Sequence, residues 1–167
     1  MAFCDWSSDV CSSDLAQVKG LTSDQIAALT TAQISALETQ DLAALTTGQV
    51  IGLTIDAINA LSAGQARALT SDQLKALSSA QVTALSTAQI AALSPGSIMG
   101  IAPEDLEGFT AGQIAALTSG QSIALTTLQL QALTSDQIAA FTTGAIQTLT
   151  TARLKSLTSS QIAPVVK

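Results

Sequence analysis

The densest group of side chains that could do chemistry is acidic and consists of Glu104, Asp105 and Glu107. Carboxylate oxygens are hard donors of the kind that calcium prefers, so this group could hold a divalent cation. The three residues also fall where a helix is expected to begin, and acidic residues favour that place because they complement the helix dipole. We interpret the group as part of a helix start and predict no metal site.

Catalytic chemistry has few other candidates. The 167 residues include no histidine and no tyrosine, and the only cysteines are Cys4 and Cys11. The commonest nucleophiles, general bases and soft metal ligands are therefore missing or confined to one short segment. We predict that the protein is not an enzyme and that it has no catalytic residues, no cofactor-binding residues and no metal ligands.

The elements that would position any functional group follow from an eight-residue repeat. Counting from Asp14, nineteen consecutive units with the consensus Thr-x-x-Gln-Ile-x-Ala-Leu run to Val165. Such a period is typical of stacked-repeat proteins, in which each unit shares its core with its neighbours. We number the octad so that Thr22 is position one and Leu29 is position eight. The sequence thus predicts a non-repeat segment (residues 1–13), an octad-repeat solenoid (14–165) and a short tail (166–167).

Four octad positions differ clearly in the residues they accept. Position eight is apolar in all nineteen units, and position five is apolar in all but one, which has Ser122. Residues three apart share one face of a helix but lie on opposite sides of a strand, so positions five and eight predict a helical core. Position seven is Ala in twelve units and Gly in four, which suggests close approach of neighbouring backbones. Position six is expected to face solvent, because it is variable and includes Lys19, Asn59, Arg67, Lys75, Glu107, Gln131 and Lys155.

Position one is Thr or Ser in sixteen units and position four is Gln in thirteen, which is the spacing of a helix capping box. The hydroxyl can accept from the amide at position four, while the Gln side chain reaches back to the amide at position one. Pro95 and Pro103 fall at position two, where a helix tolerates proline best. Acidic residues at position three would complement the helix dipole, and these are Asp24, Asp56, Asp72, Glu104 and Asp136.

One continuous helix does not fit this pattern. Eight residues at about 100° each move the apolar stripe by about 80° per unit, so no single partner surface could cover it. We predict an all-α solenoid of about nineteen short capped helices, one per octad, with two or three units per superhelical turn. The alternative is a β-solenoid, because an even period keeps strands in phase and Thr, Ile and Val favour sheets.

The first residues differ from the rest of the chain. Residues 4–15 resemble the conceptual translation of a sequencing adapter, a contaminant at the edges of assembled metagenomic reads, and we exclude them from the fold. We interpret residues 1–13 as an artefact or as disordered; the alternative is a genuine cap stapled by a Cys4–Cys11 disulfide. We also expect the sequence to be a fragment of a longer protein.

Composition limits the possible partners. The sequence is 47% hydrophobic but only 2% aromatic and 11% charged, with a net charge of −6. The six basic residues are scattered, which argues against nucleic-acid binding, and no apolar run is long enough for membrane insertion. The expected partners are the neighbouring domains of a longer chain, and a protein or glycan is possible. Repeated hydroxyl pairs could also order water as ice-binding solenoids do, although capping already engages position one; the pairs are Thr30–Thr31, Thr46–Thr47, Thr126–Thr127 and Thr142–Thr143.

Tandem units of the type Leu-Thr-Thr-Ala-Gln-Ile-x-Ala-Leu occur at residues 29–37 and 85–93. These units resemble the repeats of very large bacterial surface exoproteins of the heme-utilization or adhesion type. The resemblance implies a secreted or surface-displayed location and a role as a spacer or adhesive stalk; the alternative is a protein- or glycan-binding solenoid. It supplies no heme ligand, since the sequence has no histidine and only Met1 and Met99.

Overall fold

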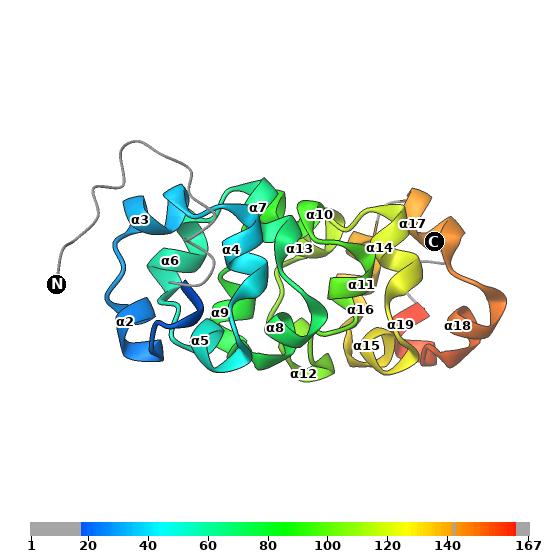
Figure 1. Ribbon diagram of the computed structural model, residues 1–167. Coiled ribbons are helices and arrows are strands. Elements are labelled where there is room, and N and C mark those ends of the chain that lie inside the picture. The colour runs from blue at the N-terminus through cyan, green and yellow to red at the C-terminus, as the bar shows by residue number, and fades with distance from the viewer. Residues whose placement is uncertain (1–17, 142, 163–167) are drawn as a thin grey trace, which may run out of the picture.

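The computed structural model of the protein describes residues 18–141 and 143–162. The adapter-like segment, the Cys4–Cys11 disulfide, Pro164 and the tail at 166–167 lie outside the described residues. Within them the chain forms an elongated array, with α2 (Ser23–Ala27) near one end and α19 (Ser159–Ile162) at the other (Figure 1).

Each octad of the described chain contributes one helix of four to six residues, and no strand occurs among these residues. The predicted all-α solenoid is confirmed, and the β-solenoid alternative is wrong for this part of the chain. Between α2 and α19 the helices are α3 (Thr31–Ala36), α4 (Thr39–Ala44), α5 (Thr47–Ile51), α6 (Ile55–Ala60), α7 (Ala63–Ala68), α8 (Ser71–Ala76), α9 (Ser79–Thr83), α10 (Thr87–Ala92), α11 (Pro95–Ile98), α12 (Pro103–Leu106), α13 (Ala111–Ala115), α14 (Ser119–Ala124), α15 (Thr127–Ala132), α16 (Ser135–Ala140), α17 (Thr143–Thr148) and α18 (Thr151–Ser156).

The helices begin as the capping pattern predicts. In α2 the Thr22 hydroxyl accepts from the Gln25 amide, and the Gln25 side chain accepts from the Thr22 amide at 2.8 Å. Thr22 has extended backbone angles (φ −78°, ψ 162°), so the chain turns sharply there before the helix starts. Proline occupies the first turn of both α11 and α12, as expected. The same two-way cap recurs in α3, α5, α7, α8, α9, α10, α13, α14, α15 and α16.

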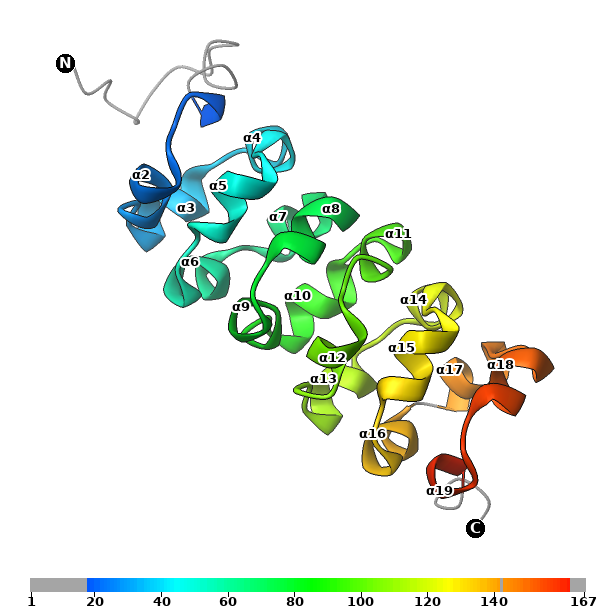
Figure 2. The ribbon, with the colours of Figure 1, turned by 90° about the horizontal axis from the view of Figure 1, so that it is seen from below.

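Each helix packs on the helix three units later, for example α2 on α5 and α5 on α8. One superhelical turn therefore contains three octads, or 24 residues, which settles the number that the sequence left open. The helices form three stacks along the array. In Figure 2, α8, α11 and α14 follow one another along one side and α6, α9 and α12 along the other. The first stack is α2, α5, α8, α11, α14 and α17; the second is α3, α6, α9, α12, α15 and α18; the third is α4, α7, α10, α13, α16 and α19.

The core runs down the middle of the three stacks. Positions five and eight supply it, as predicted, and the buried apolar residues from Val18 to Leu157 form one continuous cluster. Ser122, the polar residue at position five, is fully buried and its hydroxyl donates to the Thr118 carbonyl at 2.9 Å. The position-five residue Leu154, in α18, is 36% exposed, and Leu21, Leu29 and Ile146 are partly buried at the edge of the core.

Position seven lies where consecutive turns approach each other. A Cβ atom added to Gly52 would come within 2.4 Å of the Ser23 carbonyl oxygen on the preceding turn. One added to Gly100 would come within 2.0 Å of the Ser71 carbonyl oxygen. Real Cβ atoms do not approach a backbone oxygen so closely, so the backbones at these two positions are closer than any other residue type allows.

Candidate functional surface

The glutamine at position four does more than close the cap. In α10, Gln89 Oε1 accepts from the Ser86 amide at 2.7 Å. Its Nε2 donates to the carbonyl oxygens of Ile58 and Leu61, both at 2.7 Å, which lie 31 and 28 residues earlier. These carbonyls end the helix four units back; the Ile58 carbonyl also accepts from the Leu61 amide, and the Leu61 carbonyl lies beyond the last helical residue. One buried side chain therefore completes the start of one helix and the end of another on the preceding turn.

This bridge between turns, which we call the glutamine clamp, recurs along the array and was not predicted. Sequence reasoning assigned the column to capping alone, because the capping box fully explains a Gln at this spacing. The signal that could have revealed the second role is the amide itself, since Glu would cap equally well but occurs nowhere at position four. The clamp is made by Gln49, Gln65, Gln73, Gln81, Gln89, Gln113, Gln121, Gln129, Gln137 and Gln161.

Two units replace the glutamine with another donor. Ser97, in α11, donates from its hydroxyl to the Leu69 carbonyl, 28 residues earlier, at 2.6 Å. Arg153, in α18, donates from its guanidinium to the Ile123 carbonyl, 30 residues earlier. In these units position four supplies a hydrogen-bond donor aimed at the preceding turn, and glutamine is the usual residue, although Ala57 at the same position has no side-chain donor.

The acidic group singled out in the sequence is split by the fold. Asp105 is at position four of α12 and is 6% exposed, while Glu104 and Glu107 face solvent. Glu104 and Asp105 lie in the first turn of α12, which agrees with their interpretation as a helix start. Among the described residues, no three potential His, Cys, Asp or Glu ligands are grouped to hold a metal ion.

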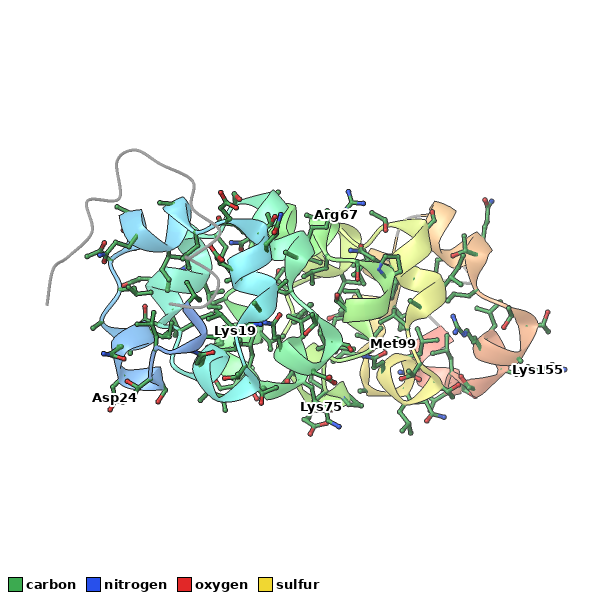
Figure 3. All side chains as sticks on the ribbon, in the orientation of Figure 1. Lys19, Asp24, Arg67, Lys75, Met99 and Lys155 are labelled. Atoms are coloured by element: carbon green, nitrogen blue, oxygen red, sulfur yellow. The ribbon has the colours of Figure 1, made fainter. Side chains whose placement is uncertain are left out.

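Position six faces solvent, as predicted. Lys19, Arg67, Lys75 and Lys155 are all exposed. Figure 3 shows Arg67 on the upper edge of the array, Lys75 on the lower edge and Lys155 at the right-hand end. The positive charges are therefore spread around the array and do not form one basic patch.

Because one superhelical turn contains three octads, outward residues that lie next to one another along the array are three octads apart in the sequence. Position six of one helix and position two of the next lie on either side of the connection between those two helices. The connections between the same two stacks recur once per superhelical turn and together form a ridge along the array. The ridge from the second stack to the third has mainly polar side chains at position six: Ser35, Asn59, Thr83, Glu107, Gln131 and Lys155. The ridge from the third stack to the first has mainly small ones: Ala43, Arg67, Ala91, Ala115 and Ala139.

The ridge from the first stack to the second differs, because it has exposed apolar side chains on three of its turns. Of the large apolar side chains that are exposed in the described chain, all except Leu154 lie on this ridge. We call it the apolar ridge and define it by Ile51, Ile55, Met99, Ile123 and Leu128.

Among the described residues, the threonine pairs do not form a ladder; Thr142, of the pair Thr142–Thr143, lies outside them. Thr30–Thr31 and Thr126–Thr127 belong to the second stack but are 96 residues apart, which is four turns. At their position-one members, Thr30 and Thr126, the hydroxyl caps its helix, as expected. A surface that orders water through regularly spaced threonines would need pairs on successive turns of one stack.

Comparison with known protein families agrees with the repeat analysis. Residues 15–37, 34–71 and 67–95 match the family model of the ALTTAQ repeat. Residues 15–95 are similar to ALTTAQ repeats. The matches are in tandem, and the units that follow residue 95 continue the same octad and the same three stacks. No curated protein matches the chain. Of the helices described, none has the length and apolar character needed to cross a bilayer.

Proposed function

We propose that the chain is a non-enzymatic structural module, a spacer or adhesive stalk segment of a secreted or surface bacterial protein. The observation that supports this function most directly is the single continuous core from Val18 to Leu157, built from units that pack only on the adjoining turns. In such an array each added unit extends the molecule without changing its cross-section. The length of the molecule is then determined by the number of repeats.

The outward surface supports a spacer over a ligand-binding solenoid. Phe109 and Phe141, the aromatic residues of the described chain, are both buried. Binding surfaces usually rely on exposed aromatic or charged anchors repeated over a contiguous patch. The outward columns of the described chain have neither.

The spacer function predicts that length scales with repeat number. Stacked helices lie about 8–10 Å apart, so each added turn of 24 residues should lengthen the molecule by about that distance. Small-angle X-ray scattering of the chain and of a version with residues 62–85 duplicated would measure the maximum dimension. An unchanged maximum dimension, or an increase in cross-section, would contradict the proposal.

The surface location rests on the resemblance to bacterial exoproteins and needs a separate test. Protease treatment of intact cells that express the native gene should remove an epitope placed within residues 94–133. A cytoplasmic protein should stay intact in the same cells until they are lysed. Protection of the epitope on intact cells would rule out display at the surface.

A further inference from the structure

Asp105 is a buried carboxylate at the octad position that elsewhere supplies the glutamine clamp. It is only 6% exposed, and its helix, α12, has no side-chain cap. Within the described chain its carboxylate takes part in no hydrogen bond and no ion pair. A buried carboxylate without a partner is costly, because it has lost water without gaining a compensating interaction.

The repeat indicates which groups Asp105 faces. Every clamp glutamine donates to the carbonyl 28 residues earlier, and most also donate to the carbonyl 31 residues earlier. For Asp105 these are the carbonyls of Leu77 and Leu74, at the end of α8. Ser97 shows that a shorter side chain also reaches the preceding turn, since it donates to the carbonyl 28 residues earlier at 2.6 Å. Asp41 is also buried at position four, but the corresponding earlier residues lie outside the described chain.

The two carbonyls that correspond to Asp105 have no donor. The Leu77 amide donates to the Gln73 carbonyl at 3.2 Å, so it leaves the Leu74 carbonyl without an amide. The Leu77 carbonyl lies beyond the last helical residue of α8 and accepts no hydrogen bond within the described chain. A carboxylate only accepts hydrogen bonds, so Asp105 cannot replace the glutamine amide. The register therefore brings together three groups that all offer oxygen atoms and no donor.

We infer that the Asp105 carboxylate and the carbonyls of Leu74 and Leu77 form a calcium site between two turns of the array. Calcium is bound by carboxylate and backbone carbonyl oxygens together, and water completes its coordination. Water can reach this site, because every fully enclosed polar side-chain atom of the described chain has a partner and the Asp105 carboxylate has none. The ion joins α12 to the end of α8, as the clamp joins the corresponding helices in other units.

The charges around the site allow a cation but predict weak binding. Glu104 and Glu107 are exposed on the same helix and add negative charge without joining the site. Lys75 is exposed and makes no ion pair with Asp105. Since only one ligand is charged, we expect a dissociation constant of about 0.1–1 mM, the range of extracellular calcium modules. Magnesium should bind more weakly, because it requires nearly ideal octahedral geometry.

Equilibrium dialysis of the full 167-residue chain against calcium chloride, in a constant background of potassium chloride, tests the site. Asp105→Ala should remove one ion per chain from the binding curve, by weakening its binding at least about tenfold. Alanine suits this position, since Ala57 has it in α6. Asp136→Ala is the matched control, because Asp136 is also in the first turn of a helix but is exposed at position three. It should leave the dissociation constant within about twofold.

Thermal unfolding with Asp105→Gln tests the register. This substitution restores the clamp donor, so in EDTA the variant should unfold about 2–4 °C above Asp105→Ala. Calcium chloride at about 10 mM should raise the unfolding temperature of the original chain by about 3–8 °C, because the ion binds only the folded state. It should raise that of Asp105→Gln and Asp105→Ala by less than about 1 °C.

Several results would overturn the calcium site. These are the absence of saturable binding up to about 10 mM calcium, an unchanged binding curve for Asp105→Ala, and an equal loss of binding in Asp136→Ala. Equal stabilisation by sodium chloride at the same ionic strength would replace calcium with a monovalent ion. If Asp105→Gln were no more stable than Asp105→Ala in EDTA, Asp105 would not face the two carbonyls. None of these outcomes bears on length scaling, so the spacer function stands or falls separately.

Discussion

At the residue scale, the amide group of the position-four glutamines explains why the octad prefers Gln. The oxygen of Gln89 caps its own helix, while the nitrogen donates to two carbonyls on the preceding turn. A Glu in the same place keeps the first interaction and removes both donors. We expect Gln89→Glu to lower the free energy of unfolding by about 3 kcal/mol, since it leaves the buried Leu61 carbonyl without its donor and places a carboxylate beside two carbonyl oxygens. Chemical unfolding followed by circular dichroism would measure the loss.

Gln25 provides the control for that substitution. It makes the same local cap with Thr22 but is exposed. Gln25→Glu should change the free energy of unfolding by no more than about 0.5 kcal/mol, because Glu suits a capping box and complements the helix dipole. Equal losses from Gln89→Glu and Gln25→Glu would show that capping, and not the clamp, is what the column supplies.

Gly48, within α5, and Gly52, the residue that follows its last turn, should respond in opposite ways to alanine. Gly52→Ala places a Cβ 2.4 Å from the Ser23 carbonyl oxygen and should destabilise the protein by about 1–3 kcal/mol through overpacking. Gly48→Ala meets nothing within 4 Å and should stabilise it by about 0.5–1 kcal/mol, because alanine favours the helix. Thermal unfolding of both variants would check the pair. A stable Gly52→Ala variant would mean that the turns can separate without cost.

The core, cap and outward positions were predictable from the sequence because each depends on neighbours within one octad. Leu at position eight and Thr at position one signal their environment through local spacing alone. The clamp was not predictable in that way, since Gln89 bonds to Leu61 across 28 residues. The apolar ridge was missed for a related reason. Ile51, Met99 and Ile123 look scattered at a period of eight and align only at a period of 24.

At the element scale, each helix is too short to be stable alone, so its ends and its packing determine where it forms. Pro95 and Pro103 show that the first helical position accepts proline. Ser79 has the same position in α9, and Ser78 before it has the extended angles that proline requires (φ −71°, ψ 158°). We expect Ser79→Pro to stabilise the protein by about 0.4–1 kcal/mol by restricting the unfolded chain. Thermal unfolding would measure this gain.

The same substitution one residue later should have the opposite effect. Ala80→Pro would force Ser79 out of the helical region and disrupt the cap that Ser78 and Gln81 make. A loss of about 3 kcal/mol is expected in the same thermal assay. If both prolines were tolerated, α9 would not need the start that its capping box defines.

At the scale of the whole molecule, the octad determines which residues form the core. The three-unit superhelical turn determines which outward residues lie next to one another on the surface. Units can follow one another in the core because most present the same cap and nearly all have apolar residues at positions five and eight, although α4 and α12 have no side-chain cap. On the surface, the number of preceding units determines which of the three stacks a unit joins. The number of units per turn arises from packing between units 24 residues apart, which explains why the octad pattern alone left two or three open.

Deletions of different lengths would distinguish the effect of the octad on the core from the effect of the superhelical turn on the surface. Removing one octad (residues 62–69) should preserve the fold, because each later glutamine finds equivalent carbonyls one unit earlier, but it moves every later helix to the preceding stack. Met99 and Ile123 would then leave the ridge of Ile51, while the helical circular dichroism should remain. Removing a whole turn (residues 62–85) should also preserve the fold and keep Ile51 aligned with Ile123.

Removing four residues (66–69) breaks the octad frame and should reduce helicity and cooperativity sharply. An eight-residue deletion that unfolds the array as badly as the four-residue deletion would contradict the interchangeability of the units.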